Sequence, residues 1–185
     1  MFFKSFAEVR EEHHSYSDAT QFSIMLPLRS CEGGSLSIAI DTQAVLSSLS
    51  WVRSSVIEKI ETDSSYAKLF RTTLESFASK LEKLDPHNIL DDIEGCLAKV
   101  SGCSIEDLIG YAHVQNWLIT VLVETSEEVA YGQLTEVSQT GLTMRLIDMY
   151  QVSVQEQTRE FDFDEVLRVD LVSQEGAMLK GFLNL

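Results

Sequence analysis

Basic side chains are scarce in this sequence. The 185 residues include 14 Lys and Arg against 29 Asp and Glu, which gives a formal net charge of −15. Residues 1–115 carry 10 basic and 17 acidic residues, whereas residues 116–185 carry 4 and 12. Affinity for nucleic acids and for anionic membranes depends largely on Lys and Arg. We therefore expect neither a nucleic acid nor a membrane as partner, and a surface this acidic favours a basic protein instead.

Long hydrophobic runs are also missing. The longest, residues 117–123, is far too short to cross a bilayer. The N-terminus shows no extended apolar region with a cleavage site, so no secretory signal is predicted. Cysteine occurs three times, at Cys31, Cys96 and Cys103, without a CxxC spacing, which favours reduced thiols. These features together predict a soluble, cytoplasmic protein.

Signatures of common catalytic and cofactor sites do not occur. The sequence contains no GxSxG, HExxH, GxGxxG or GxxxxGK[ST] motif. His13 and His14 are adjacent and follow two glutamates, but the spacing fits no recognised metal motif. We expect an exposed, solvated histidine pair there. No enzyme activity, no metal and no cofactor are expected, and an enzyme assembled from distant segments is the least favoured reading.

The chain does contain enough apolar sequence for a core, since 44% of its residues are hydrophobic. Residues 1–12 suggest a short helix. Residues 20–30 and 35–41 alternate apolar and polar residues around a CEGGS turn, which predicts a β-hairpin. Residues 42–113 change to a mainly helical periodicity, clearest over 57–84. Residues suited to cap helix N-termini occur at Ser64 or Ser65, Asp85 and Ser104.

Strand patterns return after residue 116. Residues 117–124 are almost wholly apolar and predict a strand buried on both faces. Residues 129–172 alternate in short runs separated by turns, which predicts four further strands. We therefore expect an α+β protein: a β-hairpin with a mainly helical segment over residues 1–115, then a small five-stranded antiparallel β-barrel over residues 116–185.

The segment FDFDEVLRVDLV ends this strand region with a strand, a short turn that holds Val166, and a last strand. With the strands before it, the segment resembles the ending of Sm/LSm-like or SH3-like small barrels. The resemblance implies a barrel that binds partners through exposed strand edges. RNA-binding Sm-like proteins carry a basic residue and a glycine in the turn before the last strand. The turn here reads Asp164-Glu165-Val166, and nearby SQTGLTM is followed by the single cation Arg145.

Acidic residues gather in the same segment. Two phenylalanines, Phe161 and Phe163, alternate with the acids, so inward-pointing rings would turn the carboxylates outward on one strand face. Such a face either docks a basic protein or is an ordinary solvated sheet surface. The predicted partner-binding residues are Glu156, Glu160, Asp162, Asp164 and Glu165.

Two functions follow from these features. The preferred one is a non-enzymatic, acidic protein-interaction module, of the immunity or inhibitor type, that binds and masks a basic protein partner. The alternative is a nucleic-acid-binding regulator built on an Sm-like barrel, which would need a local basic patch.

Overall fold

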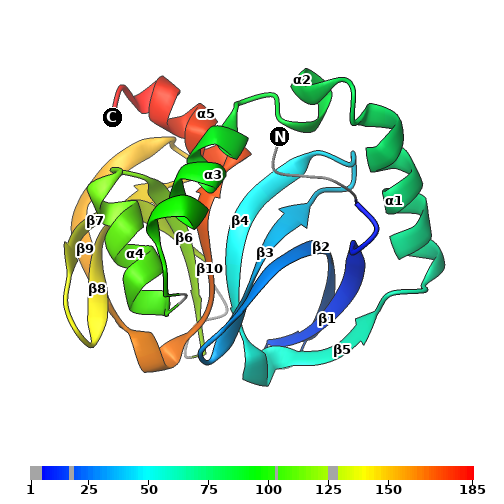
Figure 1. Ribbon diagram of the computed structural model, residues 1–185. Coiled ribbons are helices and arrows are strands. Elements are labelled where there is room, and N and C mark those ends of the chain that lie inside the picture. The colour runs from blue at the N-terminus through cyan, green and yellow to red at the C-terminus, as the bar shows by residue number, and fades with distance from the viewer. Residues whose placement is uncertain (1–5, 17–18, 103, 125–128) are drawn as a thin grey trace.

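Ten strands form one continuous antiparallel sheet (Figure 1). The computed structural model describes residues 6–16, 19–102, 104–124 and 129–185. The strands are β1 (Arg10–Tyr16), β2 (Ala19–Cys31), β3 (Gly34–Ile40), β4 (Leu46–Arg53), β5 (Ile57–Glu61), β6 (Leu118–Val123), β7 (Ala130–Val137), β8 (Gly141–Asp148), β9 (Ser153–Asp162) and β10 (Val166–Ser173). The helices are α1 (Ser65–Phe77), α2 (Leu81–Leu84), α3 (Ile89–Lys99), α4 (Ile105–Val114), α5 (Gln174–Leu183) and two 3₁₀ turns, η1 (Ser54–Val56) and η2 (Phe163–Glu165).

The sheet consists of two halves with the same chain path. Its strand order is β5-β1-β2-β3-β4-β10-β6-β7-β8-β9. In the first half, the chain leaves β4 through η1 and returns as β5 beside β1; in the second, it leaves β9 through η2 and returns as β10 beside β6. The two halves meet where β4 pairs with β10. Helices α1 to α4 are inserted between them along the chain.

The predicted C-terminal five-stranded barrel is wrong. β10 pairs with β6 on one side and with β4 on the other, so the C-terminal strands continue into the N-terminal ones. In the described part of the chain β9 pairs with β8 alone and forms one edge of the sheet. The physical reason is that β10 is buried on both faces, and pairing with β4 satisfies the edge that a separate barrel would have to cover. A division into two units at residue 115 stays a prediction.

The N-terminal strands were predicted only in part. The β2–β3 hairpin is confirmed, with Met25 opposite Ala39. The first residues of β1 fall in the segment expected to be helical, whose residues 1–5 lie outside the described ones. Residues 46–61 were also expected to be helical or mixed and form β4 and β5. In β4 serines alternate with apolar residues and both faces are buried, so the usual contrast between a wet and a dry face is missing.

Helix starts follow the predicted capping residues. Ser64 Oγ accepts a hydrogen bond from the backbone N–H of Ala67 at 3.0 Å, and Ser104 Oγ accepts one from Asp107 at 3.1 Å. The buried Asp85 carboxylate accepts from the first two backbone N–H groups of α3, at 2.8 and 2.9 Å. These contacts satisfy donors that have no partner inside the helix, which explains where α1, α3 and α4 begin.

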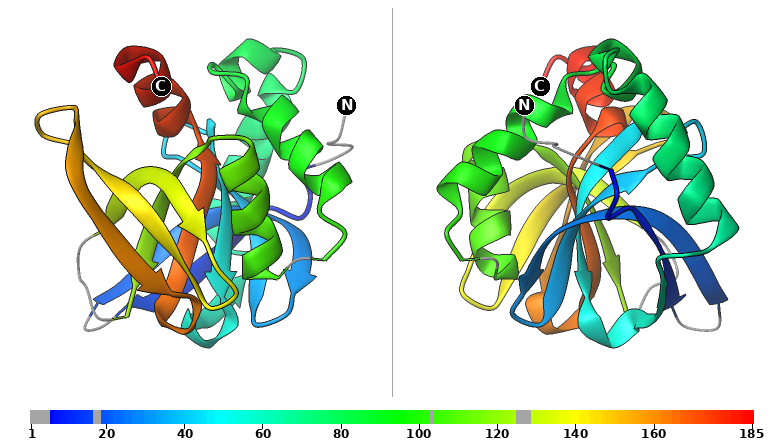
Figure 2. Two further views of the ribbon diagram at one scale, coloured as in Figure 1. Left: turned by 90° about the vertical axis from the view of Figure 1, so that its left-hand side faces the viewer. Right: turned by 45° about the vertical axis from the view of Figure 1, so that its right-hand side comes forward.

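The largest apolar core lies between the sheet and the inserted helices. Its fully buried members include Ile38, Trp51 and Val169 from the sheet and Ile93 and Ile109 from α3 and α4. Figure 2 shows α4 between the curved strands of the second half and those of the first half, with α5 near one end of the strands. In the residues that the structure describes, no helix has both the length and the apolar character required to cross a membrane.

The opposite face of the first half turns inward as strands β1 to β5 curl. Its smaller apolar cluster contains Tyr16, Met25, Ala39, Val52, Val56 and Leu167. This interior also contains polar side chains that the sequence did not lead us to expect, with Glu12, His14 and Ser50 each 0% exposed.

Candidate functional site

A hollow of about 350 Å³ opens beside edge strand β9, where the β7–β8 turn meets η2. Four acidic residues line it: Glu136 from β7, Glu160 and Asp162 from β9, and Glu165 from η2. The rest of the lining is mostly hydroxyl-bearing or apolar, and among the described residues no Lys, Arg or His contributes to it. We call this site, defined by these four carboxylates, the acidic hollow.

Strand register brings two of the carboxylates onto one face. Glu136 lies opposite Thr143 on β8, and Thr143 lies opposite Glu160 on β9. Residues directly opposite one another in neighbouring strands point to the same face of the sheet. Glu136 and Glu160 therefore flank Thr143 across three strands, roughly 10 Å apart at the backbone, as two interstrand spacings require.

The β7–β8 turn is held in a defined shape by Ser138. Its Oγ accepts hydrogen bonds from the N–H groups of Thr140 and Gly141, at 3.3 and 3.0 Å. Thr140 in turn accepts from the N–H of Phe163 at 2.9 Å, which ties the turn to η2. Gly141 has no side chain because a Cβ there would collide with the Phe161 carbonyl oxygen. Backbone hydrogen bonds and the close approach at Gly141 thus fix the β7–β8 turn, which forms one wall of the acidic hollow.

The four carboxylates have no hydrogen-bond or ion-pair partner among the described residues. Arg145 lies two residues beyond Thr143 on β8 and is exposed, but it forms no ion pair with them in this part of the chain. No group of three or more His, Cys, Asp or Glu side chains in the described segments is placed to hold a metal ion. Carboxylates that line a hollow are acceptors that a guanidinium or ammonium group on a side chain can bind.

Only some of the predicted partner-binding residues line the acidic hollow. Glu160, Asp162 and Glu165 line the acidic hollow, and the buried phenylalanines between them point inward as expected. Glu156 and Asp164 are exposed but do not line it. Glu136 was missed, because its approach to β9 depends on the pairing of three strands. The turn signal after it, SQTG, could have placed it at the hairpin end.

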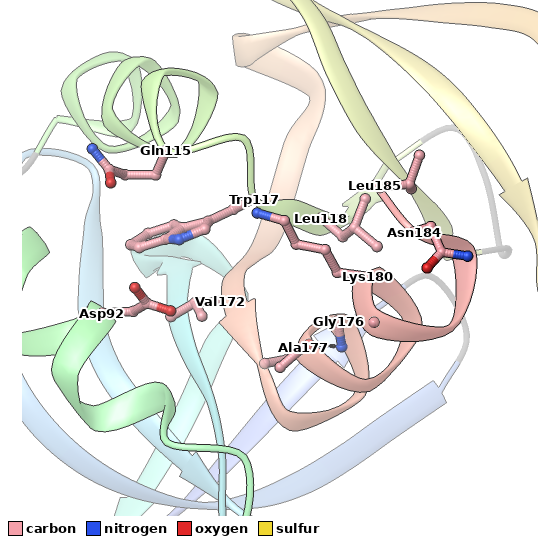
Figure 3. Close-up of a pocket in the computed structure, with 12 residues that line it drawn as sticks. Asp92, Gln115, Trp117, Leu118, Val172, Gly176, Ala177, Lys180, Asn184 and Leu185 are labelled. Atoms are coloured by element: carbon pink, nitrogen blue, oxygen red, sulfur yellow. Dashed lines mark hydrogen bonds between the residues drawn. The ribbon is translucent and has the colours of Figure 1, made fainter.

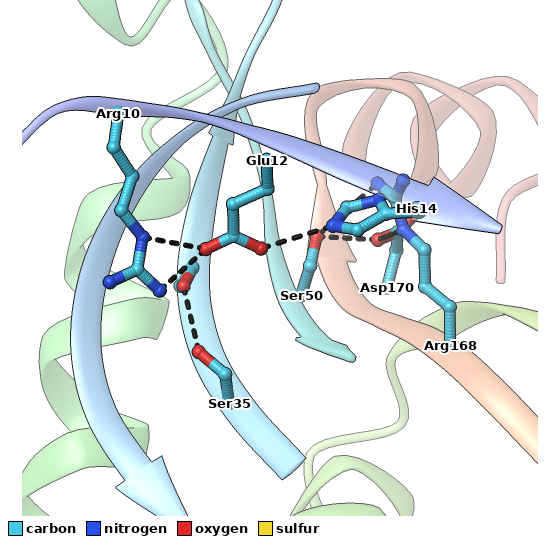
Figure 4. A network of polar contacts seen from close by, with 8 residues as sticks. Arg10, Glu12, His14, Ser35, Ser50, Arg168 and Asp170 are labelled. Carbon is cyan, nitrogen blue, oxygen red and sulfur yellow. Dashed lines mark hydrogen bonds and ion pairs between the residues drawn. The ribbon is translucent and has the colours of Figure 1, made fainter. Parts of the chain in front are cut away.

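A second polar cluster lies inside the curl of the first half (Figure 4). Arg10 Nε donates to Glu12 Oε1 at 2.8 Å, and the other oxygen of Glu12 is 3.0 Å from His14 Nε2. We call Arg10, Glu12, His14, Arg168 and Asp170 the interior polar network.

The second part of the interior polar network joins β4 to β10 through Ser50. Ser50 donates to Asp170 at 2.5 Å, and Arg168 Nε donates to the same carboxylate at 3.0 Å. Within the described part of the chain, the buried Nδ1 of His14 has no hydrogen-bond partner, whereas the buried Tyr16 hydroxyl interacts with Arg168. Burial raises the pKa of Tyr16, and the positive charge of Arg168 opposes that rise without cancelling it.

The expectation of an exposed histidine pair is wrong for His14, which is 0% exposed, whereas His13 is partly exposed. The sequence does contain the relevant signal. Charged and aromatic side chains alternate at Arg10, Glu12, His14 and Tyr16, which is the period of one strand face. Because the side chains of that face are polar, the sequence pattern is typical of a solvated surface. The curl of the sheet, which buries this face, is not visible in the sequence.

Comparison with known proteins identifies no relative of this chain. The chain matches no family model, no curated protein and no solved structure.

Proposed function

We propose that this protein is a non-enzymatic interaction module that binds a basic segment of a protein partner at β9 and the acidic hollow. The observation that carries the proposal is that four carboxylates line one hollow and have no hydrogen-bond or ion-pair partner among the described residues. A bound Arg or Lys side chain would form charge-assisted hydrogen bonds with these carboxylates. An immunity-type or inhibitor protein that masks a basic partner fits this chemistry.

The edge position of β9 supports the same proposal. Much of β9 is exposed, and its outer backbone groups have no neighbouring strand among the described ones. An extended segment of a partner can add to such an edge by main-chain hydrogen bonds, while its alternate side chains enter the adjacent site. Backbone pairing then supplies affinity, and the carboxylates select for basic side chains. We place this activity in the cytoplasm, which fractionation of cells that express the protein would check.

One arginine of the protein, Arg53, already contacts η2. Arg53, at the end of β4, donates from Nε to the Val166 carbonyl at 2.7 Å and from Nη2 to the Phe163 carbonyl at 2.6 Å. This contact occurs beside the segment that contributes Glu165 to the acidic hollow. It illustrates that the surroundings of η2 accommodate a guanidinium group.

A peptide titration tests the proposal. The probe is an extended peptide of alternating arginine and valine, and the reference is the same peptide with serine in place of arginine. We expect Glu136→Gln combined with Glu160→Gln to weaken binding of the arginine peptide about tenfold at low salt, as the loss of two partly exposed ion pairs predicts. Added salt should weaken the wild-type interaction.

The matched control removes two other exposed carboxylates, Glu58→Gln on β5 and Glu82→Gln on α2, for the same change in net charge. It should alter the affinity less than twofold. Equal weakening by the control pair would show general charge attraction and reject the acidic hollow as the site. Failure of the wild-type protein to prefer the arginine peptide would reject the proposal, and tight binding of a short single-stranded RNA would favour the alternative regulator.

A further inference from the structure

A second hollow lies at the other end of the molecule, where α3, the α4–β6 junction, β10 and α5 meet (Figure 3). Its volume is about 640 Å³, within the range of small-molecule sites in proteins. It shares no residue with the acidic hollow. We call it the α5 hollow.

Its floor is apolar and firmly held. Trp117 and Leu118, at the start of β6, and Val172 on β10 contribute to the lining. The indole of Trp117 is only 6% exposed and meets the Tyr111 ring edge-on, with ring centroids 5.4 Å apart. The small part of this fixed ring that stays exposed lines the hollow and offers a preformed contact for an apolar group.

The approach of α5 is fixed by its first turn. The N–H of Gly176 donates to Ser173 Oγ at 2.9 Å, which caps the helix. A Cβ at Gly176 would stand 3.1 Å from the Leu118 carbonyl oxygen, so glycine allows the helix to lie this close to β6. The wall formed by α5 is thus positioned by its own sequence.

Two opposite charges line the α5 hollow. Asp92 comes from the first turn of α3 and Lys180 from α5, and both point toward the hollow beside Trp117 (Figure 3). Lys180 Nζ donates to the Asn116 carbonyl oxygen at 3.0 Å, which anchors the ammonium group and leaves two of its three N–H donors for a ligand.

The Asp92 carboxylate has no hydrogen bond or ion pair among the described residues. Burial raises its pKa, the charge of Lys180 lowers it by less, and Asp91 and Asp85 add to the rise. A bound ammonium group would supply the partner that this carboxylate lacks. The amide side chains of Gln115 and Asn184 also line the hollow and add neutral donors and acceptors.

We propose that the α5 hollow binds a free apolar amino acid, with its ammonium group at Asp92, its carboxylate at Lys180 and its side chain on Trp117 and Leu118. A purely anionic ligand would leave Asp92 unpaired, and a purely cationic one would leave Lys180 without a counterion. A zwitterion satisfies both charges at once, and the apolar floor selects for a hydrophobic side chain. This binding does not depend on the proposed function of the acidic hollow.

Calorimetric titration of the full chain with L-leucine tests the proposal. Three analogues each lack one feature: 4-methylpentanoate lacks the ammonium group, 3-methylbutylamine lacks the carboxylate, and glycine lacks the apolar side chain. We expect saturable leucine binding with a Kd in the millimolar range or below and binding of each analogue at least about tenfold weaker, as the loss of one good contact predicts.

Charge-neutral variants locate the site. Asp92→Asn and Lys180→Gln should each weaken leucine binding about tenfold. The matched control Glu106→Gln removes an exposed carboxylate from the first turn of α4, which does not line the α5 hollow, and should leave the Kd within twofold. Absence of saturable leucine binding up to roughly 50 mM, equal binding of any analogue, or equal weakening by Glu106→Gln would overturn the proposal.

Discussion

Glu12 is the residue on which one half of the interior polar network depends. It is completely buried and accepts from Arg10 while it contacts His14. Burial raises its pKa, but the hydrogen bonds and positive charges of His14 and Arg10 lower it by more, so the pKa lies below the ordinary 4.5. The unfolded chain then takes up a proton more readily than the folded protein. Glu12 therefore stabilises the fold above its unfolded pKa of 4.5, and that contribution disappears as the pH falls through the lower folded pKa.

We expect Glu12→Gln to lower the free energy of unfolding by about 2 kcal/mol at neutral pH, because the partly buried Arg10 loses its counterion while a neutral acceptor remains. The difference between wild type and variant should shrink as the pH falls below 4.5 and through the lower pKa of folded Glu12, because Glu12 then becomes protonated in wild type. Urea unfolding followed by fluorescence between pH 3 and pH 7 measures both effects.

Glu8→Gln is the matched control, since Glu8 precedes β1 and is exposed; it should change stability by less than about 0.5 kcal/mol. A Glu12→Gln protein as stable as wild type at neutral pH, or a difference that does not vary with pH, would contradict the assigned role of the buried carboxylate.

At the scale of elements, η2 connects β9 to β10, borders the acidic hollow, and is bound by Arg53 from the first half. Arg53→Met keeps much of the apolar stem but removes two hydrogen bonds to the carbonyls of Val166 and Phe163. We expect a loss of about 2 kcal/mol in stability. We also expect the arginine peptide to bind about threefold more weakly, a change of about 0.7 kcal/mol. The reason is that Glu165 lies in η2, which the hydrogen bonds of Arg53 hold in place. Unfolding in urea and peptide titration measure the two effects.

Arg29 provides a matched comparison for that variant. It donates to the carbonyls of Val100 and Leu97 at the end of α3, at 2.9 and 2.8 Å, far along the sheet from β9. Arg29→Met should destabilise the protein to a similar degree and leave peptide affinity unchanged. Equal loss of affinity in both variants would mean that reduced stability, and not the position of η2, governs binding.

The elements differ in how far the sequence could predict them. Strands β2, β3 and β6 to β10 follow from local alternation and turn residues, and the capping residues mark α1, α3 and α4. β4 was missed because it is buried on both faces and interrupted by serines. The acidic hollow could be predicted only in part for a related reason. Three of its carboxylates lie close together in sequence, whereas Glu136 joins them through strand register, which local patterns do not encode.

At the scale of the whole molecule, the two halves depend on each other. Trp51 on β4 lies opposite Val169 on β10, and both are almost completely buried. Helix α4, which belongs to the N-terminal part of the chain, packs on β7 and β10. A fragment of residues 116–185 would therefore lose its helical cover as well as its neighbour strand, and residues 1–115 would expose the edge of β4.

We expect the full chain to unfold in one cooperative transition, with coincident urea curves from fluorescence and far-ultraviolet circular dichroism. Residues 1–115 and residues 116–185, produced separately, should each lack a cooperative transition, because each exposes apolar strand surface that the other covers in the full chain. Mixing the two fragments should restore part of the native dichroism, since the β4–β10 pairing can form between separate chains. A cooperative transition in either isolated fragment would instead show an independently folding unit and support the division at residue 115.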